Sequence, residues 1–239
     1  MLHLHGPDNK HLCSTHPKTD EFLVSLLKLS TFFEIEDGIT HAIEVFMLNG
    51  DDFHPALQLE LARLYCVDQW IEPAFWRLVK LPITDLNMAH MIQIGTAGYF
   101  WLVQTQAKIA KHRKAFTFDI PHVITAPDCN KPTTCKYTFT SEWNFNVPKL
   151  IHHPETPISC VELLNLLKDT EIDDVCEACR KLTVTWIWGT GHVTKEEGFV
   201  DEAVTALMAL QTDEPIRAAL RRTIPEPSPP ASPVSTHGG

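Results

Sequence analysis

The chain has no run of about 18 to 20 apolar residues, the length that a membrane-spanning helix requires. Residues 1–16 are polar and rich in histidine, and they lack the charged start and apolar stretch of a secretory signal. Basic residues are scarce, since 20 lysines and arginines face 30 aspartates and glutamates and give a formal charge of −10. These absences predict a protein of the cytoplasm or nucleus without membrane contact, and they oppose a surface that coats nucleic acid.

A disulfide framework is also missing. The chain has 7 cysteines, an odd number, and no export signal accompanies them. Disulfides are rare in reducing compartments, so closely spaced cysteines are candidates for metal ligands instead.

Apolar residues recur at helical spacing along most of the 239 residues, of which 44% are hydrophobic. The pattern predicts helices near 22–33, 35–46, 55–64, 69–80, 84–95 and 97–114, and again near 159–167, 175–188 and 194–210. Ser159 with Glu162, and Thr194 with Glu197, have capping-box spacing, and Asp173 or Asp174 is the expected cap of the helix at 175–188. Residues 116–158 lack a helical period, which predicts loop with a short strand near 116–120.

These patterns predict an all-α fold, a bundle or array of helices with a loop-rich, cysteine-bearing insert. We find no internal repeat. We expect an irregular leader over 1–18 and a helical body over 19–115. A second, cysteine-bearing helical body should follow over 116–222, and then a disordered, proline-rich tail over 223–239.

Four cysteines form two closely spaced pairs. Cys129 and Cys135 flank an insert that contains Pro132, so the segment must turn and can bring both sulfurs together. Cys176 and Cys179 form a C-x2-C pair in the first turn of a predicted helix, on one face, where backbone amides lower the thiol pKa. Two such pairs supply the all-sulfur tetrahedral set that structural zinc prefers. We therefore predict that these four cysteines bind one structural zinc ion, which holds segment 121–150 on the second body.

The long separation of the two pairs leaves a second interpretation open. It exceeds the usual zinc-finger spacing of about 12 to 20 residues, so the four could instead be reduced, partly buried cysteines that act as small hydrophobes. Cys160, His152 and His153 are substitute ligands. The same three residues could form a cysteine nucleophile with an imidazole base, but no orienting carboxylate or oxyanion-hole motif accompanies them.

Most of the chain resembles a known family, and the most specific motifs lie in its first half. Leu26–Asp37, followed by Leu59–Val67 and Trp70–Phe75, resembles the region after the BTB fold in fungal BTB domain-containing proteins. There, a helix of the pattern L-x-L-S/T-x-x-(W/F)-x-(I/F)-E-(D/E) precedes L-A-R-x-Y-x-V-x-x-W-(L/I)-x-P-A. The likeness covers about residues 20–210, although the BTB core that should precede Leu26 is largely missing. The resemblance implies homodimerisation and adaptor service in cullin-type ubiquitin ligation for complete members, and a protein-binding surface for this region.

Three functions are compatible with the sequence. The favoured one is a non-enzymatic protein-interaction or adaptor module with a structural zinc site, whose partners are other proteins, in ubiquitin-ligase or transcriptional complexes by resemblance. The second is a zinc-dependent nucleic-acid or transcription factor, which the acidic balance opposes. The third is an enzyme that uses Cys160 or a histidine.

Overall fold

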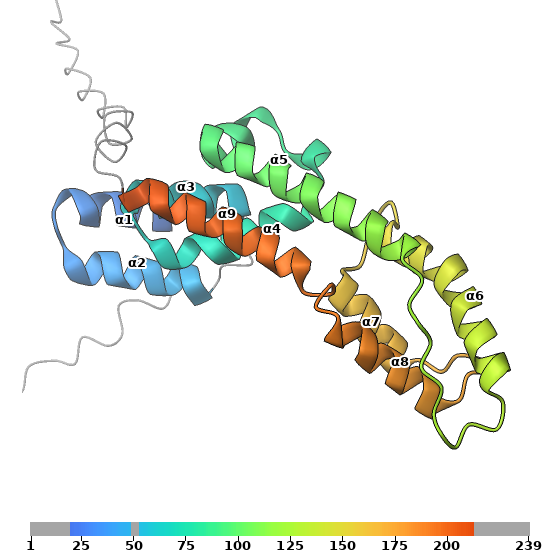
Figure 1. The fold of residues 1–239 in the computed structure, drawn as a ribbon. Coiled ribbons are helices and arrows are strands. Elements are labelled where there is room, and N and C mark those ends of the chain that lie inside the picture. The colour runs from blue at the N-terminus through green and yellow to red at the C-terminus, as the bar shows by residue number, and fades with distance from the viewer. Residues whose placement is uncertain (1–19, 49–52, 213–239) are drawn as a thin grey trace, which may run out of the picture.

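The computed structural model describes residues 20–48 and 53–212, and over these ranges the chain is all-α, as predicted (Figure 1). The helices are α1 (Asp20–Phe32), α2 (Glu36–Leu48), α3 (Pro55–Tyr65), α4 (Ile71–Lys80), α5 (Met88–Phe118), α6 (Pro132–Ile151), α7 (Cys160–Asp169), α8 (Glu177–Gly189) and α9 (Lys195–Thr212), with short 3-10 helices η2 (Asp68–Trp70) and η3 (Ile83–Asp85). The expected leader (1–18) and tail (223–239) lie outside the described residues. None of the described helices combines the length and hydropathy needed to span a bilayer.

The described residues form two large hydrophobic cores, and a third, small buried cluster contains Ala126, Cys135 and Cys179. The long helix α5 contributes to both large cores; its course is shown in Figure 1. The first core contains buried residues of α1 to α5 and of α9, including Val200 and Leu207. The second contains the end of α5 together with α6, α7 and α8. The division expected after residue 115 therefore falls inside α5, and α9 joins the first core rather than the second. An amphipathic stripe shows that a helix packs, but it does not show against which neighbour.

The expected loop at 116–158 is wrong over most of its length. Residues 116–118 end α5 instead of forming a strand, and Pro132–Ile151 form the 20-residue helix α6. Its buried residues recur at every fourth position: Cys135, Phe139, Trp143, Val147 and Ile151. This stripe is present in the sequence, but prolines interrupt the segment. Pro132 stands at the helix start, where its missing N–H costs nothing, and Pro148 lies in the last turn.

A kink in α5 joins the two helices predicted at 84–95 and 97–114. Gly95 has φ 73° and ψ 163° inside the helix, a conformation that glycine adopts at little cost. Two residues before the kink, the carbonyl oxygen of Gln93 accepts a hydrogen bond from Arg63 of α3. A Cβ at Gly95 would collide with the Arg63 guanidinium. The glycine thus permits both the bend and the close approach of α3.

The caps are partly as predicted. Ser159 and Glu162 form a complete capping box at the start of α7. The N-cap of α8 is Cys176, however, and not Asp173 or Asp174. Asp174 instead occupies a left-handed turn with φ 60°, a conformation that Asp tolerates better than most residues. This turn leads the chain into Cys176.

A buried ion pair connects the helices where the two cores meet. Arg113 of α5 donates from Nε at 3.0 Å and from Nη2 at 2.7 Å to the carboxylate of Glu196 in α9. The same carboxylate accepts the N–H of Cys160, the first residue of α7, at 3.3 Å. Glu196 is 5% exposed. Although burial opposes charge on Arg113, the carboxylate raises the pKa of its guanidinium.

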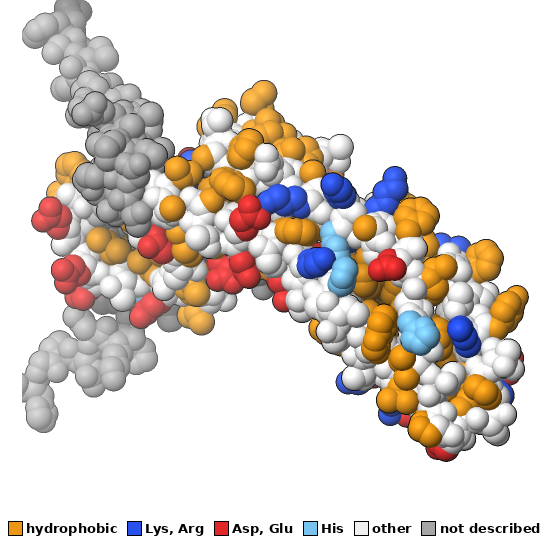
Figure 2. Space-filling model, viewed as in Figure 1, with side chains coloured by type: hydrophobic (Ala, Val, Ile, Leu, Met, Phe, Trp, Pro, Cys, Tyr) orange, Lys and Arg blue, Asp and Glu red, His pale blue; other side chains and the backbone are white. Residues whose placement is uncertain are grey.

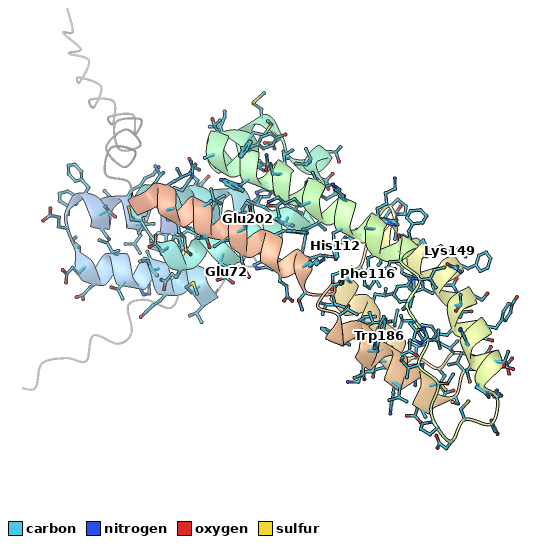
Figure 3. The ribbon with its side chains drawn as sticks, viewed as in Figure 1. Glu72, His112, Phe116, Lys149, Trp186 and Glu202 are labelled. Carbon is cyan, nitrogen blue, oxygen red and sulfur yellow. The ribbon has the colours of Figure 1, made fainter. Side chains whose placement is uncertain are left out.

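Aromatic contacts on α5 follow the same division. His112 and Phe116 lie one turn apart where α5 passes from one core to the other (Figure 3). The His112 ring centroid lies 6.1 Å from that of Phe199 in α9, and the Phe116 centroid lies 5.4 Å from that of Trp143 in α6. Side chains of α5 therefore pack against helices of both cores.

Two stacked histidines cap α3 and α5. His54 is the N-cap of α3, and its Nδ1 accepts the N–H of Ala56 at 3.2 Å. His90 completes the capping box of α5 with Asn87. The two rings stack with centroids 3.7 Å apart. Burial, then the neighbouring His90 and Arg77, lower the pKa of His54, since each disfavours an imidazolium at this position.

We expect this stack to make the stability of the protein sensitive to mild acid. The folded pKa of His54 lies below its unfolded value of about 6.5, so the unfolded chain binds more protons. Stability is therefore complete above that value and is lost as pH falls through the folded pKa. Urea unfolding of wild type at pH 7.5 and 5.5 should show this loss, and His54→Asn, which keeps a side-chain cap, should reduce it. Equal losses in wild type, in His54→Asn and in the exposed-site control His41→Asn would refute the prediction.

Candidate metal centre

Two chain segments carry the four predicted ligands to one place. Cys129 lies in the connection between α5 and α6, and Cys135 lies in the first turns of α6, where its amide donates to the carbonyl oxygen of Lys131 at 3.0 Å. Cys176 is the N-cap of α8, and Cys179 occupies its first turn. Within the described residues, the structure brings together all four cysteines that the sequence singled out.

Contacts with α8 fix the path of the connection between α5 and α6. The N–H of Ile124 donates to Oγ1 of Thr183 at 3.0 Å, and the same hydroxyl lies 2.8 Å from the carbonyl oxygen of Cys179. Val123 and Ala126 are buried beside it. The connection is thereby packed against α8, which delivers Cys129 to the start of that helix.

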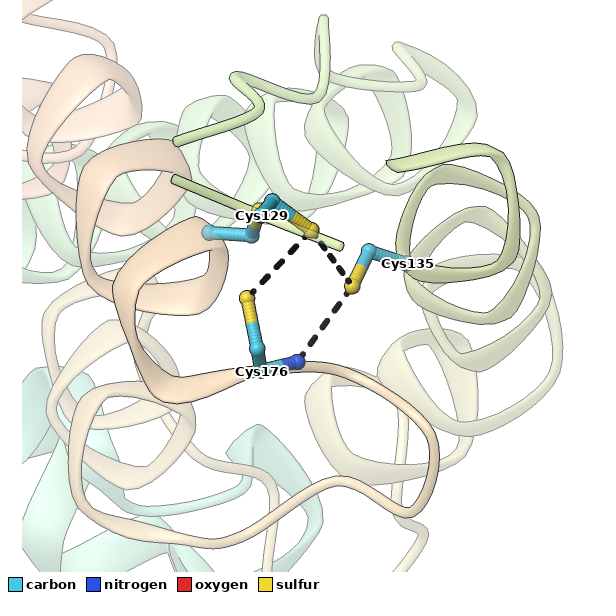
Figure 4. Close-up of side chains that lie close together, drawn as sticks. Cys129, Cys135 and Cys176 are labelled. Atoms are coloured by element: carbon cyan, nitrogen blue, oxygen red, sulfur yellow. Dashed lines mark hydrogen bonds between the residues drawn. The ribbon is translucent and has the colours of Figure 1, made fainter. Parts of the chain in front are cut away.

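The sulfur separations fit a tetrahedral metal site. All four Sγ atoms lie within 4.8 Å of one another, and Sγ of Cys129 is 3.7 Å from Sγ of Cys135 and from Sγ of Cys176. A tetrahedron with zinc–sulfur bonds of about 2.3 Å has sulfur–sulfur edges of about 3.8 Å. A disulfide would need sulfurs about 2.05 Å apart. Two of the sulfur separations therefore equal a tetrahedral edge, and all four sulfurs are close enough together to share one ion. Figure 4 shows Cys129, Cys135 and Cys176 of this cluster.

Backbone amides point at two of the sulfurs. The N–H of Cys176 donates to Sγ of Cys135 at 3.4 Å (Figure 4). The N–H of Ala126 donates to Sγ of Cys179 at 3.1 Å. Such donors orient metal ligands and stabilise thiolate charge. Sequence reasoning missed Ala126, because every residue except proline carries an N–H and only the fold aims it.

The charge balance of the site favours a bound cation. Burial raises the pKa of Cys135 and raises that of Cys179 to about 12, whereas the N–H of Cys179 lowers the pKa of Cys176 to about 7. Buried thiols resist becoming a cluster of anions unless a cation compensates them. The N-termini of α6 and α8 also face the cluster and favour negative charge there. Metal binding would release thiol protons, so it should strengthen as pH rises.

The site suits a structural ion rather than a catalytic one. Four protein ligands fill a tetrahedral shell and leave no position for water or substrate. Cys135 and Cys179 are fully buried, while Cys129 and Cys176 are partly exposed, so the cluster lies at the edge of the second core. An ion here would join the connection, the start of α6 and the start of α8.

The three substitute ligands lie outside the cluster. Cys160 is buried at the start of α7, where burial and then Glu196 raise its pKa. Nε2 of His152 lies 3.3 Å from Oγ1 of Thr117, and Nδ1 of His153 accepts the N–H of Thr156 at 3.0 Å. The two histidines thus take part in local contacts, and the thiol is buried. This arrangement opposes a Cys160 nucleophile, which requires an accessible thiolate.

A cleft of about 740 Å³ lies where α4, α5 and α7 meet, and Arg113, Glu196 and Ser159 line it. Arg113 and Glu196 are paired with each other, and Oγ of Ser159 accepts the N–H of Glu162 at 3.1 Å. Arg113 and Glu196 thus join α5 to α9, and Ser159 caps α7.

Comparisons with protein-family models, with curated proteins and with solved structures give no match for this chain.

Proposed function

We propose that the chain is a helical protein-interaction module whose second core is held by one structural zinc ion. The observation that carries the proposal is the convergence of Cys129, Cys135, Cys176 and Cys179, whose sulfurs all lie within 4.8 Å of one another. Two of these separations, at 3.7 Å each, are close to the edge of a zinc–thiolate tetrahedron. Soft thiolate ligands in a tetrahedral set favour zinc over the hard ions magnesium and calcium. The ion would serve folding, because the shell is closed.

The character of the surface supports a role in protein binding. Among the described residues, large apolar side chains are exposed on helices of both cores, including Phe32, Leu48, Phe118 and Tyr137 at 76%, 81%, 77% and 77%. Aromatic side chains of this kind dominate the energetics of protein interfaces. The resemblance to the region after the BTB fold points the same way, since that region presents surfaces to other proteins.

The net charge of −10 argues for protein partners over nucleic acid, because phosphate contacts need a basic surface. Catalysis receives no support from Cys160, whose thiol is buried. We therefore place the partners of this chain among proteins, in the adaptor role that the sequence predicts.

Two measurements on zinc-loaded protein test this function. We expect the protein to form a complex of fixed stoichiometry with another protein when it is isolated from its own cells, as shown by native mass spectrometry. We expect no salt-sensitive binding to duplex DNA or RNA in fluorescence anisotropy. A protein that neutralises several phosphates loses roughly a thousandfold or more in affinity between about 50 and 200 mM salt. Such a loss, or the absence of any protein complex, would contradict the proposal.

A further inference from the structure

The end of α1 and its connection to α2 expose a cluster of large apolar side chains. Its members are Leu29, Phe32, Phe33 and Ile35, which are 58%, 76%, 63% and 51% exposed. We call these four residues the apolar tip. The rings of Phe32 and Phe33 pack edge to face with centroids 5.0 Å apart. Exposed apolar groups that contact one another mark interaction sites more often than single exposed ones do.

The tip lies away from the face of α1 that packs in the first core. Leu23 and Leu27 are 1% and 0% exposed and, together with Ser30, form the buried stripe. Leu29 and Phe33 are four residues apart and belong to a neighbouring stripe, because successive helical residues are separated by about 100°. Packing in the first core therefore leaves the apolar tip available to another surface.

The backbone presents the tip in a fixed conformation. The N–H of Ile35 donates to the carbonyl oxygen of Ser30 at 2.8 Å, and the N–H of Glu34 donates to that of Thr31 at 3.3 Å, the hydrogen-bond pattern of a helix that ends at a left-handed residue. That residue is Glu34, with φ 55°, where glycine is the usual choice. The backbone of Glu34 thus has a conformation that glutamate rarely adopts, and such outliers point to functional sites.

Negative charge surrounds the tip. Glu34, Glu36 and Asp37 are all exposed. Over residues 21–48 there are five carboxylates and a single lysine, Lys28, which gives a charge of −4. Figure 2 shows acidic side chains over the end of the molecule that α1 and α2 form, while lysine and arginine side chains gather elsewhere.

We propose that the apolar tip binds a basic amphipathic helix of another protein, an inference that rests on the proposed function. Such a helix places leucine-like anchors on one face and lysine or arginine beside them, which complements an apolar centre with an acidic rim. The same acidic rim would repel anionic lipid, nucleic acid and the tip of a second copy of this chain. The apolar side chains alone would bind many apolar surfaces, and the acidic residues around them restrict binding to a basic partner.

The probe is a pair of fluorescein-labelled peptides, LKKLLKLLKKLLKL and LEELLELLEELLEL, titrated with full-length zinc-loaded protein. We expect the lysine peptide to bind and the glutamate peptide to bind at least about tenfold more weakly, with the difference shrinking in high salt. Phe32→Ser with Phe33→Ser should weaken binding of the lysine peptide at least about tenfold. Phe145→Ser, which changes a side chain on α6 that is 68% exposed, should leave it unchanged. Glu34→Lys with Glu36→Lys should shift the preference toward the glutamate peptide.

Each alternative has its own result. Equal binding of the lysine peptide to wild type and to the Phe32/Phe33 variant would overturn the tip assignment, and a stoichiometric protein complex would still uphold the interaction function. A dimer in sedimentation that Phe33→Ser dissociates would identify a second copy as the occupant and overturn the proposal. Replacement of Arg217, Arg221 and Arg222 by glutamate tests whether the chain's own C-terminal segment occupies the apolar tip. Stronger binding of the lysine peptide to that variant would identify this segment as the occupant and would also overturn the proposal. Thermal melts confirm that each variant is folded.

Discussion

Cys176→Ser should abolish stoichiometric zinc binding and produce the largest loss of stability of any single substitution considered for this protein. Cys176 starts α8 and lies 3.7 Å from the sulfur of Cys129, so serine would open one position of a closed thiolate shell. A ligand present at about a thousand times its dissociation constant contributes about 4 kcal/mol to folding, and structural zinc reaches this range readily. The melting temperature should fall by about 10 °C, and chelator should reproduce the effect on wild type.

Elemental analysis and thermal melts measure this directly, and Cys66→Ser is the matched control. Cys66 caps the end of α3 and is not part of the sulfur cluster. The Cys66→Ser variant should retain one equivalent of zinc. Amide exchange should show the lost protection in residues 121–135 and 172–183, with the first core less affected. Wild-type protein that contains no zinc and melts identically with and without chelator would establish the alternative of reduced, packed cysteines.

Glu196→Ala should destabilise the protein by about 3 kcal/mol. The substitution leaves Arg113 charged in a largely buried position, with 19% of its side chain exposed, and removes the acceptor of the Cys160 N–H. An uncompensated buried charge costs more than the pair contributes, because the guanidinium loses water on folding and gains nothing in return. Urea unfolding should show a lower midpoint with an unchanged slope.

Two further variants distinguish the cost of the unpaired Arg113 charge from the general effect of truncating a glutamate side chain. Arg113→Met combined with Glu196→Leu removes both charges and should recover stability to within about 1 to 2 kcal/mol of wild type. Glu202→Ala breaks the ion pair with Lys108, in which the Lys108 side chain is 35% exposed and the Glu202 side chain is 52% exposed. Because the pair is exposed, its loss should lower the free energy of unfolding by less than about 1 kcal/mol. Equal losses for Glu196→Ala and Glu202→Ala would show that burial of the pair has no energetic consequence.

Residue type and spacing predicted the four cysteines of the candidate metal site but not the groups around them. The C-x2-C pair and the turn-forming insert between Cys129 and Cys135 identified all four cysteines, because thiol chemistry and local geometry are properties of short segments. The amide of Ala126 and the packing of Thr183 on the connection were not predictable. They depend on two segments that are close in space and distant along the chain.

Most helices were predictable from the sequence, since an apolar stripe with a period near 3.6 is a local pattern that burial selects. The helix α6 was missed although its stripe runs from Cys135 to Ile151, because prolines at its ends resemble loop signals. The sequence alone determined the helical class, the acidic balance and the identity of the paired cysteines. Only the tertiary structure decided that α9 packs in the first core and that Glu196 is buried against Arg113. It also left the apolar tip exposed, since exposure depends on which neighbours a stripe finds and no stretch of sequence contains that information.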